Sequence, residues 1–373
     1  MPAVPVPVHS EALDACVVEI LGRLESAKSP VMMVGVEVRR YGLEAKVAAI
    51  SRRLGLKVVK SFMGQGLLSQ EDVDLVGTYM GAACFPEVSL LVEGSDCPFL
   101  VGVITCENNF ALSEKKIDLR KTIQALNGQV NIGYHVYDNL PLHDVVTRML
   151  EYLPGPDKEH ISTSEQRQKI PFGLQADSKP IIPVDIATAV NDLLANRQST
   201  AIPPMLMASD MGDCIFTALE IDQKGIELVA PGYYATMGFA VPAGLGLQAA
   251  TEKRPLILVG DGAFQMTGWE LGNCQRYGWD PIVLLFNNSG WGMLRAFQPG
   301  SAFNDLSPSW KFAEMAANMG GDGVRVETRA ELKAALDRAV ATRGRFQLIE
   351  ITIAKGAISN TLDRFVARLS GRP

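Results

Sequence analysis

Short apolar runs alternate with amphipathic stretches along the chain, and this pattern predicts an α/β protein. An apolar run bounded by glycine, proline or polar residues is typical of a strand buried on both faces of a parallel sheet. Strands are predicted at residues 30–38, 57–61, 98–104, 130–132, 256–260 and 281–286. Helices are predicted at residues 11–24, 43–54 and 143–153. Strands that alternate with helices in this way indicate doubly wound parallel sheets.

A polar segment divides the chain into two α/β halves. Residues 154–182 carry proline, glycine and serine with almost no apolar periodicity, which predicts an interdomain linker. We therefore expect one domain over residues 10–153 and a second over residues 183–373. The Pro-rich residues 1–9 are predicted to be a linker tail. A length of 373 residues is compatible with two domains.

Composition and charge restrict the class of partner. The chain is 47% apolar, carries a net charge of −6 and has no Lys/Arg-rich block. These features argue against nucleic acid and anionic membrane surfaces as partners. An uninterrupted apolar stretch of about 18 residues and a signal-peptide pattern are both absent from the sequence. The six cysteines lack zinc spacing and are predicted to be mostly buried thiols, so we expect a cytoplasmic protein.

The most informative chemistry lies at the ends of two neighbouring apolar runs. A GDG sequence ends at Gly262, and a double asparagine that ends at Asn288 follows after 24 intervening residues. A helix-like segment that ends near Gly278 separates them and completes a βαβ unit. Asp261 and Asn288 are therefore expected at the carboxyl edge of a parallel sheet, where ligands bind. Their oxygens suit Mg²⁺ shared with a phosphate-bearing ligand, and Gly262 lets a diphosphate approach the start of the helix.

This pattern resembles the thiamine diphosphate motif of the decarboxylase and acetolactate synthase superfamily. Two parts of the chain resemble bacterial phenylpyruvate and indolepyruvate decarboxylases most: residues 36–68 in the first half, and residues 211–306 with residues 320–336 in the second. The resemblance covers nearly the whole chain. It implies that the first half is the family's middle domain and the second its diphosphate-binding domain. It also implies thiamine diphosphate and Mg²⁺ as cofactors and a non-oxidative decarboxylation as the activity.

The resemblance assigns contacts to the metal and the diphosphate. Mg²⁺ would be held by the side chains of Asp261 and Asn288 and by the carbonyl of Gly290. Two diphosphate oxygens and a water would complete an octahedron. Backbone amides near Ala263 and Met293 would contact the diphosphate.

Further residues are implied for the rest of the cofactor. In this family a large apolar side chain holds thiamine diphosphate in a bent shape, and Met237 occupies that position. The carbonyl of Ala235 would accept a hydrogen bond from the cofactor's amino group. The turn that contains Asp213 and Cys214 resembles the one that approaches the diphosphate. Without the nearby metal motif, Met237 would be interpreted as a core methionine.

One departure from the family pattern bears on the substrate. Pyruvate decarboxylases carry a glutamate six residues after the second asparagine, and Leu294 stands there in this sequence. The leucine removes a proton-transfer group and makes the pocket more apolar. Together with Trp291 and Phe297, it predicts an aryl 2-keto acid, phenylpyruvate or indolepyruvate, rather than pyruvate. The alternative is that these side chains are ordinary core residues of a helix face.

A second departure concerns the pyrimidine-binding domain, which in this family supplies an activating glutamate and a His-His pair. The sequence begins at what resembles the linker after that domain. Glu11, Glu19 and Glu25 are predicted to lie on a solvated face, and the histidines are scattered, so no catalytic residue is assigned. We expect activity to need a pyrimidine-binding domain from elsewhere, in a homo-oligomer or a complex.

Two alternatives remain open from the sequence. The chain could be a non-catalytic truncated remnant or a partner-binding subunit of such an enzyme. It could also be another carboligase of the superfamily, such as an acetolactate synthase-like enzyme, although no feature specifically demands a flavin.

Overall fold

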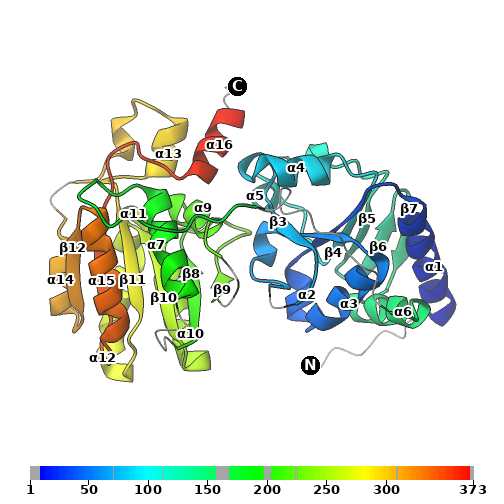
Figure 1. Ribbon diagram of the computed structural model, residues 1–373, viewed down its shortest axis with the longest axis horizontal. Helices are drawn as coiled ribbons and strands as arrows, with labels where there is room; N and C mark the ends of the chain where they lie inside the picture. The colour runs from blue at the N-terminus through cyan, green and yellow to red at the C-terminus, as the bar shows by residue number, and fades with distance from the viewer. Residues whose placement is uncertain are drawn as a thin grey trace. The chain divides into compact units, whose positions relative to one another are not determined.

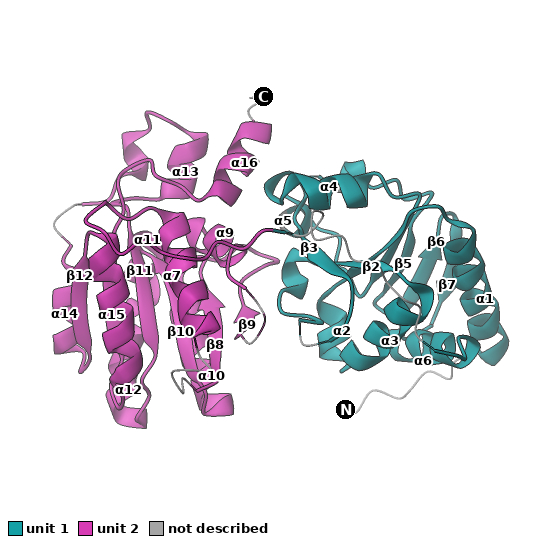
Figure 2. Ribbon diagram, viewed as in Figure 1, with its two compact units in different colours: residues 1–168 teal, residues 169–373 magenta. Residues whose placement is uncertain are grey.

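The computed structural model describes residues 9–69, 71–111, 113–156, 168–196, 203–222, 224, 226–307 and 310–369 (Figure 1). The chain divides into two compact units, residues 1–168 and residues 169–373 (Figure 2). The predicted linker at residues 154–182 spans this division, and its residues 157–167 lie outside the described residues. Of the predicted tail, only His9 is described, directly before the first helix.

The first unit contains a seven-stranded sheet of order β3-β2-β1-β4-β5-β6-β7. Its first five strands along the chain are parallel, whereas the last two continue the sheet in antiparallel pairing. The strands are β1 (Pro30–Val34), β2 (Lys57–Ser61), β3 (Leu75–Tyr79), β4 (Cys97–Val101), β5 (Ile123–Leu126), β6 (Gln129–Ile132) and β7 (His135–Asp138). The parallel part agrees with the expected fold class. The predicted strand at residues 130–132 lies in β6, but the antiparallel pairing of β6 with β5 and β7 was not predicted.

The helices of the first unit include the three that the sequence predicts. These are α1 (Ser10–Ser26), α3 (Glu44–Leu54) and α6 (Leu142–Tyr152). Their buried side chains form one core with alternate residues of the sheet, such as Met32, Val58 and Phe99. Three shorter helices were not predicted: α2 (Val36–Arg40), α4 (Pro86–Glu93) and α5 (Glu107–Phe110).

The predicted strand at residues 30–38 was too long, because β1 ends at Val34 and α2 follows. The N–H of Gly35 donates a hydrogen bond to the carbonyl of Val101 at 2.9 Å. A Cβ at Gly35 would collide with the backbone of Gly102, so the chain can pass β4 here only as glycine. The predicted strand at residues 98–104 is likewise shorter, since Gly102 has a φ of 64° and ends β4.

The second unit contains a six-stranded, fully parallel sheet of order β12-β13-β11-β10-β8-β9. Its strands are β8 (Met205–Ser209), β9 (Ile226–Val229), β10 (Arg254–Gly260), β11 (Ile282–Asn287), β12 (Asp322–Val326) and β13 (Gln347–Thr352). Strand β10 shows how both faces are covered. Leu256 and Leu258 join one core cluster, whereas Ile257 and Val259 join another on the opposite face. This arrangement confirms a doubly wound sheet.

Helices pack on both faces of this second sheet (Figure 1). The longer helices of the second unit are α7 (Pro183–Ala195), α10 (Ala240–Thr251), α15 (Arg329–Ala341) and α16 (Asn360–Leu369). Its shorter helices are α9 (Asp213–Ala218), α11 (Asp261–Thr267), α12 (Asn273–Tyr277), α13 (Gly292–Phe297) and α14 (Phe312–Asn318), and α13 has no buried residues. Residues of α7 and α15 contribute to one core cluster, and residues of α10, α11 and α14 to the other. No helix in the described ranges is long and apolar enough to cross a membrane.

The βαβ unit expected around the GDG sequence is present, although its helical connection is broken into segments. Helix α11 is followed by a 3₁₀ segment at residues 268–272 and then by α12. Gly268 packs so closely on Phe264 that a Cβ there would meet the ring at 2.5 Å. The connection ends at Gly278, which has a φ of 70°, as the sequence predicts.

Candidate functional site

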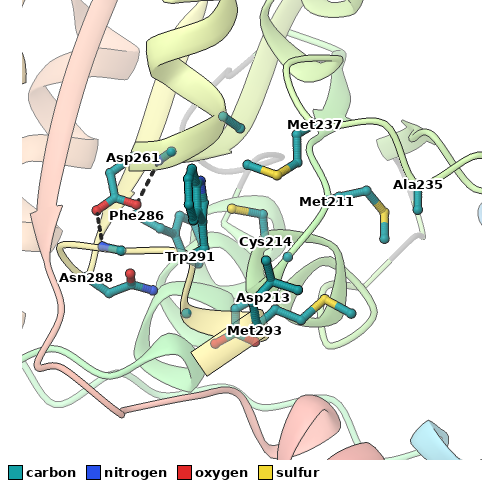
Figure 3. Close-up of a pocket in the computed structure, with 17 residues that line it drawn as sticks. Met211, Asp213, Cys214, Ala235, Met237, Asp261, Phe286, Asn288, Trp291 and Met293 are labelled. Carbon is teal, nitrogen blue, oxygen red and sulfur yellow. Dashed lines mark hydrogen bonds between the residues drawn. The ribbon is translucent and has the colours of Figure 1, made fainter. Parts of the chain in front are cut away.

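A pocket of about 250 Å³ lies at the carboxyl edge of the second sheet (Figure 3). The strands β8, β10 and β11 are neighbours there, and the chain reverses its direction of winding between β8 and β10. This is the switch point at which open α/β sheets bind ligands. Twelve of the thirteen site residues predicted from the sequence line the pocket, and the exception is Phe297.

Asp261 connects the two strand ends at the base of the pocket. Its side chain is 2% exposed and follows β10 directly. One carboxylate oxygen accepts a hydrogen bond from the N–H of Gly262 at 2.9 Å, and the other from the N–H of Gly290 at 3.0 Å (Figure 3). Burial raises the pKa of Asp261 to about 6, although these hydrogen bonds oppose the shift.

Three buried polar atoms of the pocket residues have no hydrogen-bond partner within the described part of the chain. They are Oδ1 of Asn288, Oδ1 of Asp213 and Nε1 of Trp291. An unpaired buried polar atom costs about 1–3 kcal/mol, so a polar ligand that pairs with these atoms would be favoured. Carboxylate and amide oxygens are hard donors that suit Mg²⁺, and an indole N–H suits an anionic oxygen.

The pocket residues fit a cation that is shared with an anionic ligand rather than held by protein alone. In the described ranges, no group of three or more His, Cys, Asp or Glu residues could hold a metal ion. Asp261 and Asn288 therefore provide too few protein ligands for a closed metal site. Oxygens of a bound diphosphate would complete such a site, and the N–H groups at the start of α11 would favour that anion.

Gly262 allows two side chains to close over the backbone. A Cβ at this position would meet the ring of Trp291 at 2.5 Å and the methyl group of Met237 at 3.5 Å. Figure 3 shows the Trp291 ring between Asp261 and Met237. Met237 lines the pocket and is only partly buried against the neighbouring core.

The segment that carries Ala235 and Met237 is held by a buried carboxylate. Asp210 follows β8 and accepts hydrogen bonds from the N–H groups of Gly238 at 3.0 Å and Ala240 at 2.8 Å. Ala235 has a φ of 57°, a left-handed conformation that is uncommon for residues other than glycine. The sequence places Asp210 only in the turn before Asp213 and gives no sign that it holds this segment.

Asp213 lies at the first position of α9 and is 8% exposed. Its Oδ2 accepts a hydrogen bond from the N–H of Ser359 at 2.8 Å, while its Oδ1 is unpaired. Burial raises the pKa of Asp213 to about 6. Ser359 immediately precedes α16, so the last helix is connected to the pocket. Cys214 next to Asp213 is fully buried, and burial also raises the pKa of its thiol.

The residues predicted for the substrate pocket separate into two groups. Trp291 and Leu294 line the pocket, and Leu294 is 46% exposed. Phe297 is not among the lining residues, because its ring packs edge-on against Phe365 of α16 at 5.6 Å between centroids. The structure therefore brings Leu294 to the cofactor motif and leaves Phe297 in contact with the last helix.

The glutamates and histidines that were assigned no catalytic role lie in the first unit or outside the described residues. Glu11 and Glu25 are exposed, as predicted. Glu19 is not simply solvated, because its carboxylate pairs with His135 at 3.0 Å and accepts a hydrogen bond from Tyr137 at 2.9 Å. His160 lies outside the described residues.

Comparisons with known proteins identify both halves of the chain. The family described as thiamine pyrophosphate enzyme, central domain, matches residues 17–153. The family described as thiamine pyrophosphate enzyme, C-terminal TPP binding domain, matches residues 210–351.

Curated relatives are decarboxylases by name. The chain is 58% identical over 361 residues to indole-3-pyruvate decarboxylase of Azospirillum brasilense. The aligned region covers 96% of this chain and 65% of that protein. It is 25% identical over 314 residues to alpha-keto-acid decarboxylases of Mycobacterium bovis and Mycobacterium tuberculosis. The aligned region covers 82% of this chain and 54% of those proteins. The chain thus spans between 54% and 65% of the length of these relatives.

Proposed function

We propose that this chain takes part in the non-oxidative decarboxylation of an aryl 2-keto acid to the aldehyde. The chain belongs to the thiamine pyrophosphate enzymes. The observation that carries the proposal is the pocket in which the cofactor motif meets three unpaired buried polar atoms. Phenylpyruvate and indolepyruvate are the proposed substrates. The name of the relative from Azospirillum brasilense supports this substrate class.

The residues at the base of the pocket would bind the cofactor and its metal ion. Asp261, Asn288 and the carbonyl of Gly290 are the proposed ligands of Mg²⁺, and all three residues line the pocket. The N–H of Ala263, in the first turn of α11, would contact the diphosphate, and the lack of a side chain at Gly262 would let the diphosphate approach the backbone there. Asp213, Cys214 and Met293 also line the pocket and would contact the diphosphate.

The other half of the cofactor would lie against the segment before α10. Met237 would hold the two rings apart, and the carbonyl of Ala235 would orient the aminopyrimidine. Thiamine diphosphate supplies the electron sink for the electron pair that is left behind as CO₂ departs. The task of these residues is therefore to fix the cofactor's shape and to exclude water from its reacting side.

The wall next to the substrate is apolar in this chain. Leu294 stands where pyruvate decarboxylases have a glutamate, and together with Trp291 it would provide a hydrocarbon surface that favours an aryl group over a methyl group. Among the residues that line the pocket, the carboxylates are those of Asp213 and Asp261. We infer that the activating glutamate comes from a pyrimidine-binding domain, whether in the same polypeptide or in a partner chain of an oligomer.

Calorimetric titration with thiamine diphosphate and Mg²⁺ would test the binding half of this proposal. We expect binding that needs both components, because the metal ion requires oxygens from the diphosphate. A decarboxylation assay with phenylpyruvate, indolepyruvate and pyruvate follows, with and without a separately supplied pyrimidine-binding domain. Turnover of the aryl acids only when that domain is added would support the proposal. Absence of cofactor binding would instead favour a non-catalytic subunit.

A further inference from the structure

We propose that Arg295 is a positioning residue that holds the metal loop, defined as residues 288–291, in the shape that binds Mg²⁺. This inference rests on the proposed function, because it concerns the same metal site. Arg295 lies on α13, one residue beyond Leu294, and its side chain is 10% exposed. Neither the GDG sequence nor the double asparagine points to this residue.

The guanidinium of Arg295 contacts the backbone on both sides of the loop. Its Nη2 donates to the carbonyl of Ser289 at 3.1 Å and its Nη1 to the carbonyl of Asn288 at 3.5 Å. Nη2 also donates to the carbonyl of Asn304 at 3.5 Å, in the 3₁₀ segment at residues 302–304. A planar group with several fixed donors can hold several carbonyls at once in a way that a lysine cannot.

The loop needs such support because its backbone is in an unfavourable conformation. Ser289 has a φ of 55°, in the left-handed region that favours glycine. Its carbonyl also accepts a hydrogen bond from the N–H of Leu306, and the N–H of Trp291 donates to the carbonyl of Asn304. The backbone carbonyls of Asn288 and Ser289 are turned to Arg295 and Leu306, whereas the buried side-chain Oδ1 of Asn288 has no hydrogen-bond partner among the described residues.

A second set of contacts fixes Arg295 itself. Its Nε donates to Asp305 at 3.0 Å, and the same carboxylate accepts a hydrogen bond from Lys355 at 2.6 Å. Lys355 follows β13, so the guanidinium is tied to a different strand from the one that leads into the loop. Gly290 packs directly under the guanidinium, where a Cβ would collide with Arg295 and with the carbonyl of Asn304. The loop and the arginine therefore fit each other closely.

The test compares Arg295→Met and Arg295→Lys with the control Arg345→Met. Arg345 forms an exposed ion pair with Asp322 in the same unit, so its removal leaves the pocket intact. The first measurement is hydrogen exchange of the amides of residues 288–291 in the protein without ligands. We expect faster exchange at Gly290 and Trp291 in Arg295→Met, a smaller change in Arg295→Lys, and the parent rate in the control.

The second measurement is the Mg²⁺ dissociation constant at saturating thiamine diphosphate. Loss of a residue that orients metal ligands typically weakens metal binding by roughly 10- to 100-fold, and we expect this range for Arg295→Met. Parent-like loop exchange together with parent-like Mg²⁺ affinity in Arg295→Met would overturn the inference. If the parent binds no Mg²⁺, the proposed function fails, while the exchange measurement still decides whether Arg295 holds the loop. Should Arg295→Met fold poorly, Asp305→Asn provides a milder variant with changes in the same direction.

Discussion

The side chain of Asp261 has two roles. It connects the ends of β10 and β11 through its hydrogen bonds, and it is the only carboxylate among the proposed metal ligands. We predict that Asp261→Ala abolishes detectable Mg²⁺-dependent binding of thiamine diphosphate, because even the loss of a residue that only supports a metal ligand costs roughly 10- to 100-fold in metal affinity. Calorimetric titration measures this loss. Asp337→Ala removes an exposed carboxylate paired with Lys333 on α15 and is the matched control. A variant at position 261 that binds like the parent would show that the metal site is assigned wrongly.

Asp213 should make the ligand-free protein sensitive to pH. Burial raises the pKa of Asp213 to about 6, above its value in an unfolded chain. The folded protein therefore binds the proton more tightly, and the stability linked to this group is present below about pH 4 and lost as the pH rises through about 6. A shift of about 2 units corresponds to roughly 3 kcal/mol at most.

We predict that Asp213→Asn raises the melting temperature of the ligand-free protein at pH 7.5 and has little effect at pH 4.5. The amide can still accept the hydrogen bond from the N–H of Ser359, and it removes the buried charge. Thermal unfolding of both proteins across this pH range tests the prediction. An equal difference in melting temperature at both pH values would mean that titration of Asp213 does not contribute.

At the scale of elements, the segment before α10 depends on one carboxylate for its position. Asp210 accepts hydrogen bonds from Met211, Gly238 and Ala240, and its side chain is fully buried. We predict that Asp210→Ala destabilises the second unit by about 2–4 kcal/mol, because several buried N–H groups lose their acceptor. Urea unfolding measures the loss.

Substitutions at Asp210 test the role of the segment before α10 without changing a proposed metal ligand. Asp210→Asn keeps an acceptor of the same size and should lose less stability than Asp210→Ala. Because Met237 lies on the segment, both variants should bind thiamine diphosphate more weakly in proportion to their loss of stability. Full cofactor affinity in a strongly destabilised Asp210→Ala would contradict the view that this carboxylate positions Met237.

The elements also show why some of the fold could be predicted from the sequence and some could not. The runs predicted as strands at residues 256–260 and 281–286 agree closely with β10 and β11, because a buried parallel strand needs a continuous apolar stretch. The run at residues 30–38 was overextended, because the close approach of Gly35 to Gly102 is a contact between two strands. The antiparallel strand β7 has mostly exposed residues and therefore leaves no apolar run to detect.

Some residues of the candidate site could likewise be predicted from the sequence, and others could not. The placement of Asp261 and Asn288 at one edge of the sheet could be predicted because they directly follow the two strands of one βαβ unit, whose geometry follows from local sequence. Gly290 was implied only by the family resemblance. Ser359 could not be predicted, because it meets Asp213 across 146 residues of chain. Arg295 is near the metal loop in sequence, but its support from Lys355 comes from another strand. Phe297 was expected at the pocket and instead packs against Phe365, a contact that also depends on a distant helix.

At the scale of the whole molecule, the chain contains two units with separate hydrophobic cores, and the candidate site belongs to one of them. All residues that line the pocket lie between positions 211 and 294, within the second unit. We predict that thiamine diphosphate with Mg²⁺ slows hydrogen exchange in residues 205–306 and leaves the core of the first unit unchanged. Ligand at 100 times its dissociation constant stabilises the form that binds it by about 2.7 kcal/mol, which exchange can detect. Exchange with Asp261→Ala under the same conditions provides the control, and equal protection in both units of the parent would mean that the ligand also binds or orders the first unit.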